Sequence, residues 1–170
     1  CQKRGMVYRI IRTDQDPNTM AQVGKILDDL DKTGATVARI DQIGIGYGIV
    51  QRGIELGRPF IGVNVGIGAE DDESASDERF ANLKCQLYYH LRGLFERGEI
   101  DIDPEDVDLA SELCTIRYER MSNGRLKISD KHKDDKGKTI QSPNRAEALM
   151  LAASPKRLTR GIIEREILWG

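Results

Sequence analysis

The stretch Val37-Ala-Arg-Ile-Asp-Gln-Ile-Gly-Ile-Gly-Tyr-Gly48 combines a short apolar run, a carboxylate and three alternating glycines. The run 35–40 is too short for a helix and rich in β-branched residues, so it predicts a buried strand. The glycines indicate a tight turn and a close approach of the backbone to a neighbouring group. Open α/β sheets hold their sites where a central strand ends and the chain turns into a helix, which is the place of Asp41. A plainer interpretation is that Asp41 caps the next helix and the glycines only turn the chain.

Strands and helices alternate around this stretch up to residue 65. Asp16 and Pro17 suit an N-cap and a first helical residue, and Gly34 suits a helix end. The alternating order implies right-handed crossovers and a parallel core. The predicted elements are a strand over 6–12, a helix from Asp16 to Gly34, a strand over 35–41, a helix over 46–56 and a strand over 58–65.

The second half of the chain predicts helices and one hairpin. Asn123-Gly124 is a typical two-residue hairpin turn, and Ser142-Pro143 is a typical helix start. Asn144 and Glu147 are three residues apart in that last helix, so their side chains are expected side by side. The predicted elements are helices over 78–97 and 104–113, a hairpin over 117–129 and a helix from Ser142.

Length and composition favour one water-soluble domain. The chain has 170 residues, of which 32% are charged and 39% hydrophobic, and no apolar run approaches the roughly 18 residues of a membrane span. We expect a domain over residues 1–154 and a C-terminal tail over residues 155–170. The three cysteines have no metal-ligand spacing, which favours reduced thiols in an intracellular protein.

The charge is distributed unevenly along the chain. Residues 1–124 carry 15 Lys/Arg and 22 Asp/Glu, whereas residues 125–145 carry 7 and 3. A basic segment on an acidic body is a candidate contact for a polyanion, although its charge alone favours a solvated loop. For the acidic run over residues 70–73 we likewise favour a solvated loop over a cation site.

Hydrolysis of a phosphodiester bond makes specific demands on a protein site. The substrate is anionic and unreactive, and two divalent ions about 3.5–4 Å apart can activate the water and stabilise the leaving oxygen. Such hard ions need carboxylate ligands rather than thiols or histidines. A strand-end Asp and a helix-borne Glu could supply part of that set, beside a lysine-rich loop that holds the DNA backbone. Asp41, Glu147 and the segment 131–138 fit this description.

Four segments carry motifs of a known family: Asp41-Gln-Ile-Gly-Ile-Gly-Tyr-Gly-Ile-Val50, Gly62-Val-Asn-Val-Gly66, Arg79-Phe-Ala-Asn-Leu-Lys84 and Ser142-Pro-Asn-Arg-Ala-Glu-Ala-Leu149. They resemble the C-terminal nuclease domain of the large terminase subunit of tailed bacteriophages. Their order and spacing also match, and the resemblance covers nearly the whole chain. The first and last segments are the most specific.

The resemblance implies an RNase H-like α/β fold, in which helices flank both faces of a mixed sheet and a β-hairpin is added. It implies a metal-dependent endonuclease domain that cuts concatemeric double-stranded DNA for viral packaging by two-metal hydrolysis. The expected cofactor is Mg²⁺ or Mn²⁺, since both suit oxygen ligands. The implied partners are double-stranded DNA, the terminase small subunit, the portal and an upstream ATPase domain. The implied location is the host cytoplasm, with no membrane.

The resemblance also assigns roles to individual residues. Asp41 is the acidic ligand after the central strand, and Glu147 takes the acidic position of the C-terminal helix, where the family usually has Asp. Asn144 stands where the family often has a further Asp, and its amide can coordinate a metal ion but supplies no charge. Asp41 and Glu147 are therefore the expected catalytic residues and, with Asn144, the expected metal ligands. The expected DNA contacts are Lys131, Lys133, Lys136, Lys138 and Arg145.

One feature of the family is not matched. Its first catalytic Asp lies on a strand before the one that starts near Met6. We therefore expect this sequence to be either a piece of a longer chain or a partial homologue that lacks one metal ligand and one strand. Two alternatives to an active terminase nuclease therefore stay open. One is a catalytically impaired DNA-binding or assembly domain of the same fold, and the other is a RuvC-like junction resolvase, whose C-terminal pattern is also similar.

Overall fold

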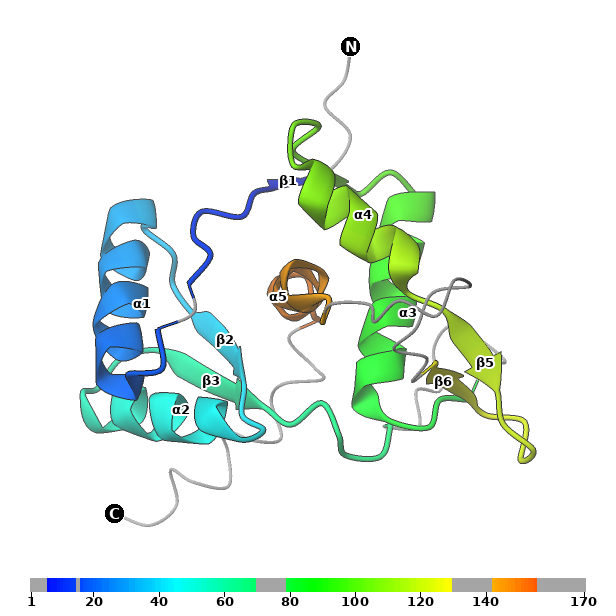
Figure 1. The fold of residues 1–170 in the computed structure, drawn as a ribbon, viewed down its shortest axis with the longest axis horizontal. Coiled ribbons are helices and arrows are strands. Elements are labelled where there is room, and N and C mark those ends of the chain that lie inside the picture. The colour runs from blue at the N-terminus through cyan, green and yellow to red at the C-terminus, as the bar shows by residue number, and fades with distance from the viewer. Residues whose placement is uncertain (1–5, 15, 70–78, 130–141, 156–170) are drawn as a thin grey trace. The chain divides into compact units, whose positions relative to one another are not determined.

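The chain folds into two compact units that each combine helices with a pair of parallel strands. The βαβ unit comprises residues 12–67 and 151–170, and the hairpin unit comprises residues 1–11 and 68–150. Figure 1 shows the helices and strands of both units. The computed structural model describes residues 6–14, 16–69, 79–129 and 142–155. Almost all of the predicted tail lies outside these residues, so the division into a domain and a tail stays a prediction.

Two parallel strands and two helices make up the βαβ unit. β2 and β3 pair in parallel, with Ala38 opposite Phe60 and Asp41 opposite Val63. The parallel arrangement predicted from the alternating order is therefore confirmed for this pair. The elements are α1 (Thr19–Thr33), β2 (Ala38–Asp41), α2 (Ile45–Glu55) and β3 (Phe60–Val63).

The core of the βαβ unit joins both helices to the strands. Val23 and Leu30 of α1, Ile49 of α2 and Phe60 of β3 form one buried cluster. Helix α2 lies close to β3 through Gly53, because a Cβ at that position would lie 2.1 Å from the Phe60 ring. Val23 and Leu30 therefore lie on the core side of α1.

Helix α1 begins later than predicted. Asn18, not Asp16, is the N-cap, and its side chain accepts hydrogen bonds from the backbone N–H groups of Met20 and Ala21. Asp16 accepts a hydrogen bond from the Asn18 backbone instead. Both residue types make good caps, and the one nearer the helix satisfies the free N–H groups. Gly34 ends the helix as predicted, with a left-handed φ of 67°.

The hairpin unit holds four short strands in two pairs. β1 and β4 pair in parallel, with Met6 opposite Ile100, whereas β5 and β6 form the predicted antiparallel hairpin. Gly124 in its turn has a φ of 80°, which suits glycine. The strand β4 was not predicted from the sequence. The strands are β1 (Met6–Tyr8), β4 (Ile100–Ile102), β5 (Tyr118–Arg120) and β6 (Leu126–Ile128).

The first two helices of this unit also begin later than predicted. Asn82 caps α3 by accepting from the Cys85 N–H, and Asp106 caps α4 by accepting from the Leu109 N–H. The chain before α3 is extended, because Phe80 forms an isolated bridge with Leu126 of the hairpin. The helices are α3 (Leu83–Glu96), α4 (Val107–Thr115) and α5 (Asn144–Ala152), of which α5 lies in the hairpin unit up to Met150.

A second buried cluster links α3 to the hairpin. Phe80, Cys85 and Leu126 are its buried members, and the Tyr89 ring lies 5.1 Å from the Phe80 ring. The described strands pair two by two within their units. The α/β class and the added hairpin are thus confirmed. None of the helices in the described part of the chain is long and apolar enough to cross a membrane.

Candidate functional site

Asp41 is the last residue of β2, as predicted from its place after the apolar run. The Gln42 N–H continues the ladder by donating to the Val63 carbonyl over 3.1 Å. Oδ1 of Asp41 accepts a hydrogen bond of 3.0 Å from the Ile43 N–H. Oδ2 has no hydrogen-bond partner among the described residues, and the side chain is half-buried. One carboxylate oxygen is therefore fixed by the backbone, and the described part of the chain leaves the other without a hydrogen bond.

The glycines after Asp41 are required by the close path of the backbone. Gly44 has a φ of 65° and is the N-cap of α2, where it makes no side-chain hydrogen bond. A Cβ on Gly46 would lie 1.7 Å from the carbonyl oxygen of Asp41. The predicted close approach is confirmed. The plainer interpretation of Asp41 as a helix cap is wrong, because its side chain closes a turn at Ile43 instead.

Asn64 is a polar residue that our sequence analysis did not assign to the site. It directly follows β3, and β3 is the parallel neighbour of β2. Its Oδ1 accepts a hydrogen bond of 3.1 Å from the Gly66 N–H. The carboxyl ends of parallel neighbours lie at one sheet edge, so Asp41 and Asn64 both border that edge. The same signal that singled out Asp41, a polar residue directly after an apolar run, applies to Asn64.

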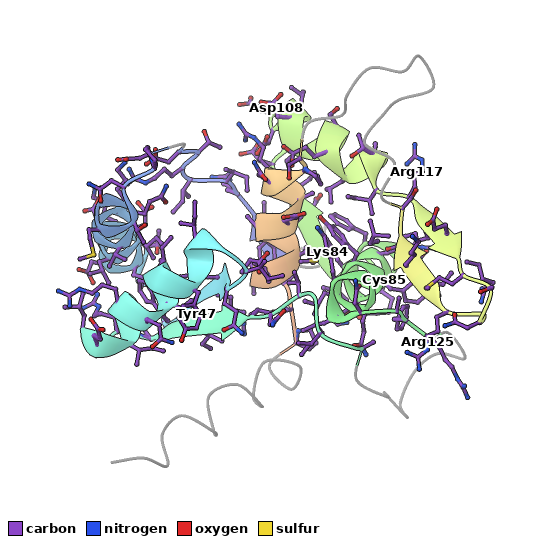
Figure 2. All side chains as sticks on the ribbon, turned by 60° about the horizontal axis from the view of Figure 1, so that its bottom comes forward. Tyr47, Lys84, Cys85, Asp108, Arg117 and Arg125 are labelled. Atoms are coloured by element: carbon purple, nitrogen blue, oxygen red, sulfur yellow. The ribbon has the colours of Figure 1, made fainter. Side chains whose placement is uncertain are left out.

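Glu147 lies on α5, and its carboxylate forms an ion pair with the Lys84 ammonium of α3. Figure 2 labels Lys84 on its helix. The Lys84 side chain is 31% exposed and the Glu147 side chain is 24% exposed, so solvent still reaches both. No local sequence pattern indicates this pair, because its members are 63 residues apart. A cation bound to Glu147 would compete with Lys84 for the carboxylate.

Three carboxylates contact the start of α5: Asp106, which is the N-cap of α4, and Asp108 and Glu112, which lie within α4. Arg145 contacts the Asp106 carboxylate at 3.1 Å and the Asp108 carboxylate at 3.3 Å. The Ala146 N–H donates to Oε2 of Glu112 over 2.9 Å. Glu112 of α4 therefore places a negative charge at the N-terminus of α5, where the helix dipole favours it. A DNA phosphate would have to compete with two carboxylates for Arg145, which stays a predicted DNA contact.

The remaining predicted site residues are placed as follows. Asn144 begins α5 and is exposed, and Glu147 follows in the same helix; that their side chains lie side by side stays a prediction. Asp41 belongs to the βαβ unit and Glu147 to the hairpin unit, so their convergence on one metal centre stays a prediction. Within the described ranges no three His, Cys, Asp or Glu residues gather as a metal cluster. The predicted DNA contacts outside the described residues are Lys131, Lys133, Lys136 and Lys138.

Comparison with known proteins identifies the fold. Neither a protein-family model nor a curated protein sequence matches the chain. Among solved structures, a point mutant of the nuclease domain of the large terminase subunit of bacterial virus Sf6 with manganese gives a TM-score of 0.61 at 20% identity, over 78% of this chain and 72% of that chain. The chain has the fold of phage terminase nuclease domains.

Two further structures support the same fold. The Sf6 nuclease domain gives a TM-score of 0.60 at 22% identity, over 78% of this chain and 71% of that one. The large terminase nuclease of thermophilic phage G20c, solved with bound magnesium, gives a TM-score of 0.54 at 20% identity. The match covers 79% of this chain and 60% of that one. The terminase-nuclease fold confirms the RNase H-like class that the four motifs implied.

Proposed function

We propose that this chain is the nuclease domain of a viral DNA-packaging terminase, which cuts concatemeric double-stranded DNA with Mg²⁺ or Mn²⁺. The observation that carries the proposal is Asp41, which ends β2 with one carboxylate oxygen that no described residue hydrogen-bonds. It stands at the carboxyl edge of a parallel strand pair, the usual position of sites in α/β sheets. The solved terminase nuclease domains of this fold include structures with manganese, calcium and magnesium.

The available donors suit hard divalent cations by their chemistry. Asp41 and Glu147 offer carboxylate oxygens, and Asn144 and Asn64 offer amide oxygens, the ligand types that Mg²⁺ and Mn²⁺ prefer. Two bound divalent metal ions would activate the attacking water and stabilise the leaving oxygen. Asp41 keeps its orientation through the Ile43 N–H, so Oδ2 is presented without side-chain reorganisation. Glu147 would have to give up its ion pair with Lys84 in order to bind a metal ion.

The DNA-binding role rests on charge. Residues 125–145 carry 7 Lys/Arg against 3 Asp/Glu, and we assign Lys131, Lys133, Lys136 and Lys138 to the phosphate backbone. Such contacts carry no sequence information, which suits a packaging nuclease that cuts along a concatemer. The proposal includes the terminase small subunit, the portal and an upstream ATPase domain as partners in the host cytoplasm.

A second candidate is a DNA-binding or assembly domain that has this fold and does not cut. The ion pair between Lys84 and Glu147 favours it, because it occupies a proposed metal ligand with a protein cation. Two carboxylates and amides are also few ligands to hold two ions against their repulsion. Both candidates predict salt-sensitive DNA binding, so cleavage has to discriminate between them.

The decisive experiment compares relaxation of supercoiled plasmid in Mn²⁺ by the wild-type chain and by Asp41→Asn. The asparagine can still accept from the Ile43 N–H, so the turn is kept while the charge is lost. We expect the rate to fall at least about 100-fold, beyond the effect usual for residues that only support a ligand. Asp31→Asn, which changes an exposed aspartate of the same unit, is the matched control. Cleavage that survives Asp41→Asn would refute the assignment, and DNA binding without any cleavage would favour the second candidate.

A further inference from the structure

Arg39 lies on β2 two residues before Asp41. Ala38 and Ile40 pack against the buried cluster formed by α1, α2 and β3. Successive side chains of a strand point to opposite faces, so Arg39 and Asp41 share the face away from that cluster. Their Cα atoms are about 6.6 Å apart, because each strand residue adds about 3.3 Å. A long basic side chain is therefore the neighbour of the proposed metal ligand on its face of the strand.

The Arg39 guanidinium is held at a single point within the described part of the chain. Its Nη1 donates to the Ala152 carbonyl over 3.3 Å, in a position exposed to solvent. Its Nε is buried and has no hydrogen-bond partner among the described residues. A guanidinium has five N–H donors, and the described residues offer this one only the uncharged Ala152 carbonyl as an acceptor. The outer nitrogen Nη2 therefore has no acceptor within the described ranges.

Arg39 differs from the other described arginines of the βαβ unit, because each of those forms an ion pair with a carboxylate. No described carboxylate pairs with Arg39. Its positive charge is thus not neutralised by a described neighbour, and the planar fork of a guanidinium matches the oxygens of a phosphate. The pairs of the other arginines are Arg12 with Asp29, Arg52 with Glu55 and Arg58 with Asp31.

We propose that Arg39 binds a backbone phosphate of the DNA strand that is cut, next to the phosphodiester at Asp41. This inference rests on the proposed nuclease function. Two parallel N–H bonds from a guanidinium can hold one phosphate, and such contacts fix the register of a protein on a duplex without reading its sequence. Arg39 then determines which bond of the strand reaches Asp41. The plainer role is a cap for the C-terminal end of α5, whose last residue is Ala152.

The first test measures binding of a short duplex by fluorescence anisotropy at several salt concentrations, with Ca²⁺ in place of Mn²⁺. Arg39→Gln removes the charge but keeps a donor for the Ala152 carbonyl. We expect its affinity to fall roughly tenfold, and the slope of log K against log salt concentration to fall by about 0.9, the value of one phosphate contact. Arg39→Lys keeps the charge and should keep the slope. An unchanged slope in Arg39→Gln, or an equal loss of slope in Arg39→Lys, would overturn the proposal.

Arg58→Gln is the matched control. Arg58 lies just before β3, at the opposite end of the strand pair from Asp41, and its Nε is also buried without a partner among the described residues. Its charge is already paired with Asp31, so we expect a slope close to that of the wild type. Equal losses of slope in Arg39→Gln and Arg58→Gln would reduce the effect to net charge and overturn the proposal. So would a loss of stability of Arg39→Gln in urea with no change of slope, because that combination fits the cap alone.

Plasmid cleavage in Mn²⁺ separates this inference from the proposed function. Loss of a contact to a phosphate that does not react should raise KM roughly tenfold and leave kcat unchanged. A fall in kcat at unchanged KM would overturn the placement of Arg39 on a phosphate next to the reacting one. Cleavage by the wild-type chain with an unchanged slope in Arg39→Gln would refute the role of Arg39 alone. A slope that depends on Arg39 without any cleavage would refute the nuclease activity and support the phosphate contact, and a wild-type chain that binds no DNA would overturn both.

Discussion

Lys84 on α3 forms an ion pair with Glu147 on α5, and the carboxylate that it holds is a proposed metal ligand. The pair joins two helices of the hairpin unit whose sequences are far apart. It gives this unit a protein cation at the position where the proposed nuclease would need a divalent ion. The ammonium and a metal ion must therefore compete for the same oxygen.

This competition predicts that Lys84→Met tightens Mn²⁺ binding and Glu147→Gln weakens it. Partly exposed pairs are worth up to about 1 kcal/mol, so the gain for Lys84→Met should reach about fivefold in Kd. Isothermal titration calorimetry measures both effects. Lys32→Met, which breaks an exposed pair with Asp28, is the matched control. Identical affinities of Lys84→Met and the wild-type chain would mean that Glu147 does not bind the ion.

The contact between Glu112 and the Ala146 N–H predicts a stability effect. Glu112→Ala leaves the N-terminus of α5 without its acceptor and should lower the free energy of unfolding by about 0.5–2 kcal/mol, the range for lost helix caps. Urea denaturation measures it. Glu105→Ala, an exposed change in the turn before α4, should have little effect. Equal losses in both variants would show that the hydrogen bond has no special weight.

The glycines predict opposite effects at two helical positions. A Cβ on Gly46 meets the Asp41 carbonyl oxygen at 1.7 Å, whereas a Cβ on Gly24 of α1 meets nothing within 4 Å. Gly46→Ala should therefore destabilise the chain by roughly 3 kcal/mol. Gly24→Ala should stabilise it by about 0.5–1 kcal/mol, because alanine favours the helix. Thermal denaturation compares the two, and a stable Gly46→Ala variant would contradict the packing of α2 on the end of β2.

Local signals predicted the elements best where one residue type alone fits the backbone. Gly34 and Gly124 both adopt left-handed φ values, at the expected helix end and in the expected hairpin turn. Helix starts were less certain, since Asp16 and Asn18 both suit an N-cap and only the packed helix selects between them. The strand β4 has three residues and exists through its pairing with β1, which no local pattern encodes.

The candidate site was likewise predictable only where residues adjacent in the sequence define it. Asp41 follows an apolar run into a glycine turn, so its place at a strand end could be inferred from neighbours in sequence. The partners of Glu147 and Arg145 could not, because Lys84 and Asp106 come from distant segments. Such contacts depend on tertiary packing, and charge alone does not reveal which of many lysines or aspartates will meet.

Burial of Cys85 predicts a pH dependence of stability. Burial raises the pKa of its thiol from 9.0 to about 12. Above pH 9 the unfolded chain loses this proton and the folded chain keeps it, so the free energy of unfolding should fall as the pH rises from about 9 to about 12. Cys85→Ala should delay the decline by about one pH unit, to the range where tyrosines such as Tyr118 begin to contribute. Urea denaturation at pH 8, 9 and 10 measures the shift, and parallel curves for both proteins would contradict it.

The last prediction separates the two basic elements assigned to DNA. Each phosphate contact contributes about 0.9 to the slope of log K against log salt concentration. Replacing four lysines by alanine should therefore lower the slope by up to about 3.6 for a duplex. Fluorescence anisotropy at several salt concentrations measures it. The lysines are Lys131, Lys133, Lys136 and Lys138.

Arg145→Ala provides the comparison within the same experiment. Its guanidinium already contacts Asp106 and Asp108, so a phosphate gains access only by displacing them. We expect its slope to fall by less than the 0.9 units of a full contact, together with a modest loss of stability because the cap of α4 loses its partner. An unchanged slope in the lysine variant would mean that the basic segment does not contact DNA, which favours its interpretation as a solvated loop. A loss of one full unit in Arg145→Ala alone would move the DNA contact to the start of α5.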